Sequence, residues 1–255
     1  MTIINVLSEH ASKNPDATAV VFENSEWSYS ELYQHSKKVA SYLLEKGYKK
    51  GDIIGQFMLN SDIFLAVYYG AQLAGLTIMP VNTKLAPPEI DYIFYHSEAK
   101  ALFYDEKLSN IIDQTSYIFQ EKINTTEIKE ILAGETTLNR TIELDENDTA
   151  VVMYTSGTTG KPKGVMLSHK NLYSTAEIWS ESMKMTENDR MYICTPLFHC
   201  AGSHVFAVPT MYKGGAVVIE EAFSPDRTLR KLVETKSIWL SDIPSTLIIY
   251  DKQNA

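Results

Sequence analysis

The part of the sequence best suited to chemistry is the stretch 153–165, which reads MYTSGTTGKPKGV. Nine of the ten residues from 155 to 164 are Gly, Ser, Thr or Lys. Glycines let the backbone curl tightly and bring its N–H groups close to a ligand. Hydroxyl and ammonium groups would then face whatever fills the curl. Such a loop suits a polyphosphate, whose oxygens need converging donors and positive charge.

Two other interpretations of this loop fit less well. A Walker A loop is excluded, because Gly157 and Gly160 stand too close together and Pro162 follows Lys161. A flexible Gly/Ser/Thr linker is the plain alternative. A linker, however, has no need of Lys-Pro-Lys-Gly shortly after a strand-like run, 149–154. We therefore expect a phosphate-binding loop.

This stretch resembles the phosphate-binding signature of the adenylate-forming superfamily, which includes acyl-CoA synthetases, aryl-CoA ligases and luciferases. Members activate a carboxylic acid with ATP and Mg²⁺ to an acyl-adenylate, and most then pass the acyl group to a thiol. The resemblance implies ATP, Mg²⁺ and CoA as cofactors, and no metal ligand is assigned within this sequence. It makes Lys163 the catalytic, phosphate-facing cation. The cofactor-binding residues that it implies are Thr155, Ser156, Gly157, Thr158, Thr159, Gly160, Lys161 and Lys163.

Short motifs in the family's order extend the resemblance over essentially the whole chain. Each is weak alone, but their order argues against coincidence. They are residues 27–32, 51–52, Asn60, 74–75, 80–82, 196–199, Gly202, 214–216, 223–225 and 243–246.

Three histidine or aromatic positions bear on the substrate pocket. Phe198 and His199 follow Pro-Leu at the end of an expected strand, and in similar ligases the matching His borders the acyl pocket. A satisfied core histidine is the alternative, and we favour orientation or gating of the acid. His169 stands where the family often has a His, and a helix cap is an equally good interpretation. The apolar residues after His199 suit an acyl tunnel or a buried helix.

The choice of acid is less determined than the reaction. The Asp-containing pocket motif of peptide-synthetase adenylation domains is not evident, which favours a plain carboxylic acid. Within that class, the apolar segment after His199 favours a fatty acid. An aryl-acid or amino-acid adenylating enzyme stays open, as does a truncated module that binds ATP or an acyl chain without catalysis. Chain length, CoA against a carrier-protein thiol, and oligomeric state are left undetermined, with a homodimer as one option.

Family motifs expected to bind adenine, ribose and Mg²⁺ do not occur in the 255 residues. The resemblance therefore covers only the N-terminal half of the family's length, and we expect the C-terminal domain to be absent here. We also expect the 255-residue chain by itself to catalyse little adenylation.

The elements that must position these residues alternate between strands and helices. Such alternation predicts an α/β fold with stacked, largely parallel sheets flanked by helices. Ligands in such folds bind at the carboxyl ends of strands, where the 149–154 strand delivers its loop. We expect residues of about 52–185 to form one subdomain with the phosphate loop, and about 1–50 plus 190–255 to form part of a second.

Three stretches carry specific structural expectations. Residues 64–81 hold no charge, and we interpret them as a buried helix, 63–74, and a buried strand, 76–79, instead of a membrane span. Residues 28–31 form a capping box that begins a helix. Residues 117–119 are expected to form a strand, and 121–148 a polar surface excursion with one helix near 126–132.

Composition limits the partners. A hydrophobic fraction of 44% is ample for a packed core, and a net charge of −9 argues against nucleic acid or an anionic membrane as the main partner. Cys194 and Cys200 are too few for a disulfide framework or a zinc site, so buried free thiols in a cytosolic protein are expected. The predicted partners are small molecules.

Overall fold

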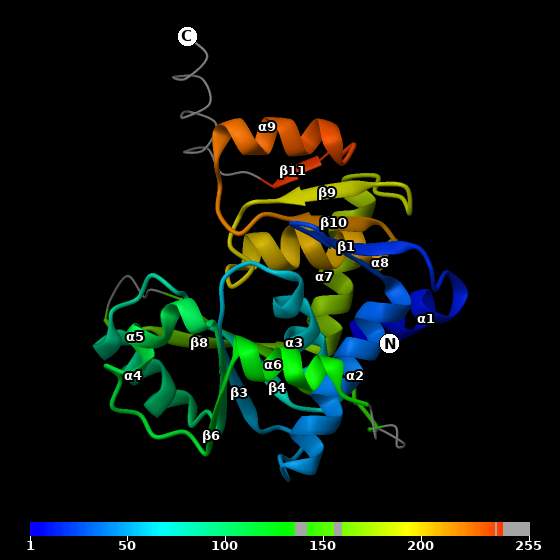
Figure 1. Cartoon of the computed structure of the whole chain (residues 1–255). Coiled ribbons are helices and arrows are strands. Elements are labelled where there is room, and N and C mark those ends of the chain that lie inside the picture. The colour runs from blue at the N-terminus through cyan, green and yellow to red at the C-terminus, as the bar shows by residue number, and fades with distance from the viewer. Residues whose placement is uncertain (136–141, 156–159, 238, 242–255) are drawn as a thin grey trace.

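A computed structural model of the 255-residue chain describes residues 1–135, 142–155, 160–237 and 239–241. It contains two sheets, which lie one above the other in Figure 1. The predicted α/β class, with largely parallel sheets flanked by helices, is confirmed.

The first sheet has five strands, and all its neighbours are parallel except the β1–β2 pair. The strand order is β11 (Trp239–Ser241), β9 (Arg190–Ile193), β10 (Ala216–Ile219), β1 (Thr18–Phe22) and β2 (Ser25–Ser28).

The second sheet has six strands, and all its neighbours are parallel except the β7–β8 hairpin. The strand order is β6 (Glu121–Asn124), β5 (Ala101–Tyr104), β3 (Ile53–Phe57), β4 (Thr77–Pro80), β7 (Thr149–Thr155) and β8 (Lys163–Ser168).

The helices pack between the sheets and on their outer faces (Figure 1). Their bounds are α1 (Ile3–Lys13), α2 (Tyr29–Glu45), α3 (Asp62–Leu73), α4 (Pro87–Ser97), the 3₁₀ turn η1 (Glu106–Leu108), α5 (Ser109–Ile112), α6 (Thr125–Ala133), α7 (His169–Ser182), the π-helix η2 (Ala201–Ala207), α8 (Val208–Tyr212) and α9 (Pro225–Glu234).

The main core lies between the sheets. Alternate strand residues point to opposite faces, so Ile54 and Val151 enter this core, whereas Leu102 and Val152 pack under α4 on the far face. Helix α3 contacts strands of both sheets, and nearly all of its residues are buried. A helix that is apolar all round belongs in such an interior. The uncharged run 64–81 is therefore buried helix and strand, as predicted.

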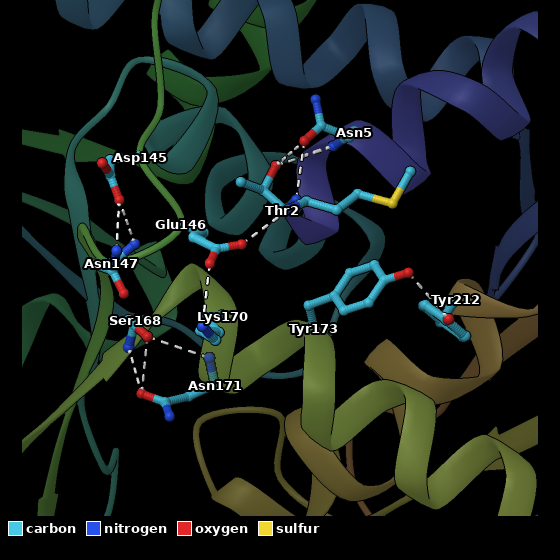
Figure 2. Close-up of polar contacts among 11 residues, drawn as sticks. Thr2, Asn5, Asp145, Glu146, Asn147, Ser168, Lys170, Asn171, Tyr173 and Tyr212 are labelled. Atoms are coloured by element: carbon cyan, nitrogen blue, oxygen red, sulfur yellow. Dashed lines mark hydrogen bonds and ion pairs between the residues drawn. The ribbon is translucent and has the colours of Figure 1, made fainter.

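Local capping signals define several helix starts. The predicted capping box of α2 is present: Ser28 Oγ accepts from the Glu31 N–H at 3.2 Å, and the Ser28 N–H donates to Glu31 Oε2 at 2.7 Å. Asn supplies the reciprocal bond at α1 and α7, with Asn171 pairing with Ser168 (Figure 2). Nearby, Glu146 accepts from the N-terminal ammonium and from Lys170 (Figure 2).

Two strand predictions are wrong. Residues 117–119 form no strand, because Tyr117 and Phe119 turn their rings onto Phe94, with a Phe94–Phe119 centroid distance of 4.6 Å. The next segment is β6, an edge strand, so 121–124 belongs to the sheet and not to a surface excursion. The sequence pattern does not reveal β6, because Ile123 is its only buried residue.

Strand β8 is the third difference. Residues 155–164 are expected to form one loop with no strand after it, whereas the chain returns along β7 as β8 before α7 begins. Val165 and Met166 of this strand are exposed, so it carries little buried pattern. The motif at 243–246 lies outside the described residues. Among the described helices, none is long and apolar enough to cross a bilayer.

Candidate active site

The β7–β8 hairpin brings the two flanks of the predicted phosphate loop together. Thr155 at the end of β7 pairs with Lys163 at the start of β8. Thr155, Gly160, Lys161 and Lys163 are all exposed. Because β7 runs parallel to β4, this end of the hairpin lies at the carboxyl edge of the sheet. Ser156, Gly157, Thr158 and Thr159 lie outside the described residues.

A cavity of about 390 Å³ opens beside this hairpin. Four segments that are distant in sequence contribute to it: the end of β4, the first turns of α4, the loop flanks and the connection after β9. Thr155 therefore shares one cavity with Phe198 and His199. The lining residues are Pro80, Val81, Asn82, Leu85, Glu89, Ile93, Met153, Tyr154, Thr155, Pro162, Phe198, His199 and Cys200.

His199 is exposed and held by its own turn. Its Nδ1 accepts from the Ala201 N–H at 3.2 Å, and its carbonyl accepts from the Ser203 N–H at 3.2 Å. Since Nδ1 acts as an acceptor, the proton of the neutral ring is assigned to Nε2. The turn is tight enough to require glycine at position 202, because a Cβ on Gly202 would lie 2.3 Å from the Pro196 carbonyl oxygen.

Helix α4 supports both flanks of the loop. Tyr92 Oη donates to the Pro162 carbonyl at 3.3 Å, and Lys161 Nζ lies 5.2 Å from the centroid of the Tyr92 ring. One turn later, His96 Nδ1 is 2.6 Å from Tyr154 Oη. These contacts fix the approach to the loop from β7 and the return toward β8.

His169 is not part of this cavity. It follows β8, whose last residue, Ser168, pairs with Thr149 at the amino end of β7, and so lies at the opposite end of the hairpin from the loop. Ser168 caps α7 by accepting from the Asn171 N–H, so the interpretation of His169 as a cap is wrong. His169 is buried, and burial lowers its pKa from the ordinary 6.5 to about 4.

Several lining residues are missed by sequence reasoning. Glu89 and Ile93 come from α4, Leu85 comes from the connection that leads into it, and Tyr154 precedes the loop. Cys200 was expected to be buried; it is exposed, whereas Cys194 is buried as expected. Their position in the sequence could have identified them, because residues that follow parallel strands gather at the carboxyl edge of the sheet. Asn82 has that signal, since it follows β4.

A larger cavity of about 840 Å³ lies near the carboxyl ends of β1, β3, β5 and β6. It contains none of the predicted site residues. Two of its charged side chains, Lys107 and Glu221, pair with each other at 2.5 Å. We therefore take the smaller cavity, which joins the loop to Phe198 and His199, as the candidate site.

Known proteins are similar to this chain over nearly its whole length. The AMP-binding enzyme family matches residues 7–247. The 2-succinylbenzoate–CoA ligase of Bacillus licheniformis is 30% identical over 244 residues, which cover 96% of this chain and 50% of that protein. The long-chain-fatty-acid–CoA ligase FadD13 of Mycobacterium tuberculosis is 27% identical over 250 residues, 95% of this chain and 50% of that protein.

A solved structure gives the same result. The N-terminal domain of FACL13 from Mycobacterium tuberculosis superposes with a TM-score of 0.91 at 26% identity, over 98% of this chain and 64% of that chain. The present chain spans about half the length of the curated relatives it matches.

Proposed function

Because this chain belongs to the AMP-binding enzyme family, we propose that it forms the phosphate- and acid-binding part of an acid–CoA ligase. The observation that carries the proposal is the shared cavity in which Thr155 and Pro162, flanking the Gly-rich loop, meet Phe198 and His199. An ATP phosphate at the loop and an acid against the pocket wall would be neighbours there.

The proposed first step joins the acid to AMP. A carboxylate oxygen attacks the α-phosphorus of ATP, the new O–P bond forms, and the bond to the bridging β-phosphate oxygen breaks with release of pyrophosphate. The acid is already ionised at neutral pH, so positioning and charge stabilisation supply most of the catalysis. Lys161, Lys163 and the loop hydroxyls would hold the departing phosphates.

In the proposed second step, the CoA sulfur, as thiolate, attacks the carbonyl carbon of the adenylate. The carbon–oxygen bond to AMP then breaks and AMP leaves. Phe198 and His199 would orient the acyl group in both steps. Mg²⁺ would neutralise phosphate charge when bound. Among the described residues no group of three or more His, Cys, Asp and Glu could hold a metal ion, so we assign no metal ligand.

The cavity lining favours an apolar monocarboxylic acid, such as a fatty acid. Most lining side chains are apolar, among them Val81, Leu85, Ile93, Met153 and Phe198. No lysine or arginine occurs among the lining residues that the structure describes, so a second carboxylate would lack a partner at the wall. An aryl acid is the runner-up, because relatives with that type of substrate are among the matches. The homodimer and the cytosolic location stay predictions.

Pyrophosphate exchange into ATP tests the proposal directly. The protein isolated from its natural source is assayed with fatty acids of graded length, an aromatic acid, a dicarboxylic acid and an amino acid. We expect exchange with the apolar monocarboxylic acids and thioester formation after CoA is added. Exchange driven only by amino acids would contradict the choice of acid. Binding of ATP without exchange would favour a non-catalytic module.

A further inference from the structure

Asn60 connects the two sheets and lines the larger cavity. It follows β3, in the connection to α3, and its residue is 5% exposed. Its Nδ2 donates to the Thr195 carbonyl at 3.1 Å and to the Glu220 carbonyl at 3.0 Å. Its Oδ1 accepts from the Leu197 N–H at 2.7 Å. A single buried amide thus binds three backbone groups of the other sheet's loops.

These three partners lie where the pocket wall begins. Thr195 and Leu197 belong to the connection that follows β9, and Glu220 follows β10. Leu197 is fully buried, and the next two residues are Phe198 and His199. The bond to the Leu197 N–H therefore holds the backbone immediately before the two predicted pocket residues.

We propose that Asn60 is a positioning residue, which holds the 195–199 connection so that Phe198 and His199 face the acid. The inference rests on the proposed function. Asn60 itself does not line the candidate cavity, so it acts through the backbone of its three partners. The six-stranded sheet carries the phosphate loop and the five-stranded sheet carries Phe198 and His199, and Asn60 sets one against the other.

Only an amide meets the requirements of this position. Two donors face two carbonyls while one acceptor faces an N–H. Asp keeps the acceptor but places a carboxylate oxygen against two carbonyls. Ala leaves three buried backbone groups without these bonds, and each unsatisfied group is costly. Both variants should therefore displace the 195–199 connection, Asn60→Asp through repulsion between oxygens and Asn60→Ala through lost hydrogen bonds.

A matched control is available at the first residue of α2. Tyr29 is buried, and its Oη donates to the Gly215 carbonyl at 2.6 Å. Gly215 precedes β10 and thus lies at the opposite end of that strand from Glu220. Tyr29→Phe removes this buried hydrogen bond, and the longer one from the same Oη to the Met211 carbonyl at 3.4 Å, without touching the site. This variant distinguishes a general loss of stability from displacement of the 195–199 connection.

The test combines hydrogen exchange of the ligand-free protein with acid-dependent pyrophosphate exchange by the natural full-length protein. We expect both Asn60 variants to speed amide exchange over 195–203 and to raise KM for the acid by about 10- to 100-fold, with KM for ATP unchanged. Tyr29→Phe should change neither. Unaltered amide exchange over 195–203, or an equal rise of both KM values, overturns the positioning role.

Failure of the proposed function would look different. If the wild-type protein shows no acid-dependent exchange with any acid, the ligase assignment fails and the role of Asn60 in positioning an acid fails with it. If the wild type is active and the Asn60 variants match it, only the inference about Asn60 is overturned.

Discussion

Two of the predicted phosphate-binding residues are also strand residues. Thr155 and Lys163 form a cross-strand pair, so the Lys163 side chain extends from a fixed point beside the cavity. Lys161 has a different environment, with its ammonium over the ring of Tyr92. ATP would have to replace that cation–π contact before Lys161 could bind phosphate. Removal of Lys163 is therefore the simpler test.

Replacement of Lys163 by alanine should reduce adenylation while leaving the fold intact. Its ammonium is exposed, so removal costs little stability, whereas lost charge stabilisation should lower kcat/KM by about 100-fold or more. The measurement is pyrophosphate exchange by the full-length protein, with circular dichroism as the check on folding. Lys170→Ala, at the far end of the same hairpin, is the control. Equal activity in Lys163→Ala and wild type would remove Lys163 from the site.

Cys200 provides a chemical probe of the cavity. It is exposed and lines the candidate site, whereas Cys194 is buried. Iodoacetamide should therefore label Cys200 faster than Cys194, and a bound acid should slow the labelling of Cys200 alone. Peptide mass spectrometry with and without acid measures this, with Cys200→Ser as the blank. Labelling of Cys200 that no acid slows would argue against an acid in this cavity.

Among the elements, the π-helix η2 follows directly after the residues that line the site. The segment 197–213 is mostly helical, with a turn ahead of a π-helix and a short α-helix. Gly202 permits the turn by its close approach to Pro196. His204 of η2 is buried against Tyr68, with 2.9 Å between Nε2 and Oη. Backbone packing and a buried histidine therefore fix this element.

Gly202→Ala should destabilise the protein and open the turn that carries His199. The added Cβ would meet backbone atoms that cannot move aside, which typically costs about 1–3 kcal/mol. Gly134→Ala is the matched control, because its Cβ would make only ordinary contacts, the nearest at 3.4 Å. Urea unfolding measures both. Equal stability of the two variants would show that the turn relaxes at little cost.

Stability should fall on acidification through two buried histidines. Burial lowers the pKa of His204, and that of His169, from 6.5 to about 4. Between pH 6.5 and 4 the unfolded chain therefore binds protons that the folded chain refuses. The stabilisation, on the order of 3 kcal/mol per histidine, is present above pH 6.5 and is lost as pH falls toward 4.

Urea unfolding at several pH values measures this loss. His204→Gln should reduce the pH dependence by about half, because His169 keeps its contribution. Tyr68→Phe keeps the buried imidazole and should retain the slope while lowering stability at every pH. An unchanged slope in His204→Gln would contradict the assignment.

On the scale of the whole molecule, the two sheets meet through α3 and the Asn60 bonds. We propose that residues of about 52–185 form one subdomain around the six-stranded sheet, with about 1–50 and 190–255 contributing to the second. The candidate cavity draws on both sheets, so the position of one relative to the other should determine how well an acid fits.

The purified 255-residue chain should give far less acid-dependent pyrophosphate exchange than the protein from its natural source. The motifs expected to bind adenine, ribose and Mg²⁺ do not occur in this sequence, and each such contact can contribute orders of magnitude in rate. The intact mass of the natural protein is measured alongside the assay and compared with the 28.8 kDa of this chain. Robust exchange by the chain alone would contradict this expectation.

The sequence alone determined several local elements and indicates the chemistry proposed for the loop. Ser28 and Glu31 define a helix start within four residues, the uncharged run 64–81 indicates a buried helix and strand, and the Gly/Ser/Thr/Lys stretch indicates phosphate binding. Each of these signals lies within a short stretch of sequence, because helix capping and the periodicity of buried residues depend on neighbours along the chain.

Only the tertiary structure decided which residues meet. Strands β6 and β8 lie at a sheet edge with few buried residues, so their pairing depends on a neighbour and not on their own pattern. The exposure of Cys200 depends on how the chain turns after β9. The bonds of Asn60 reach partners 135 to 160 residues away. Such contacts follow from the order of strands in the two sheets, which no short stretch of sequence specifies.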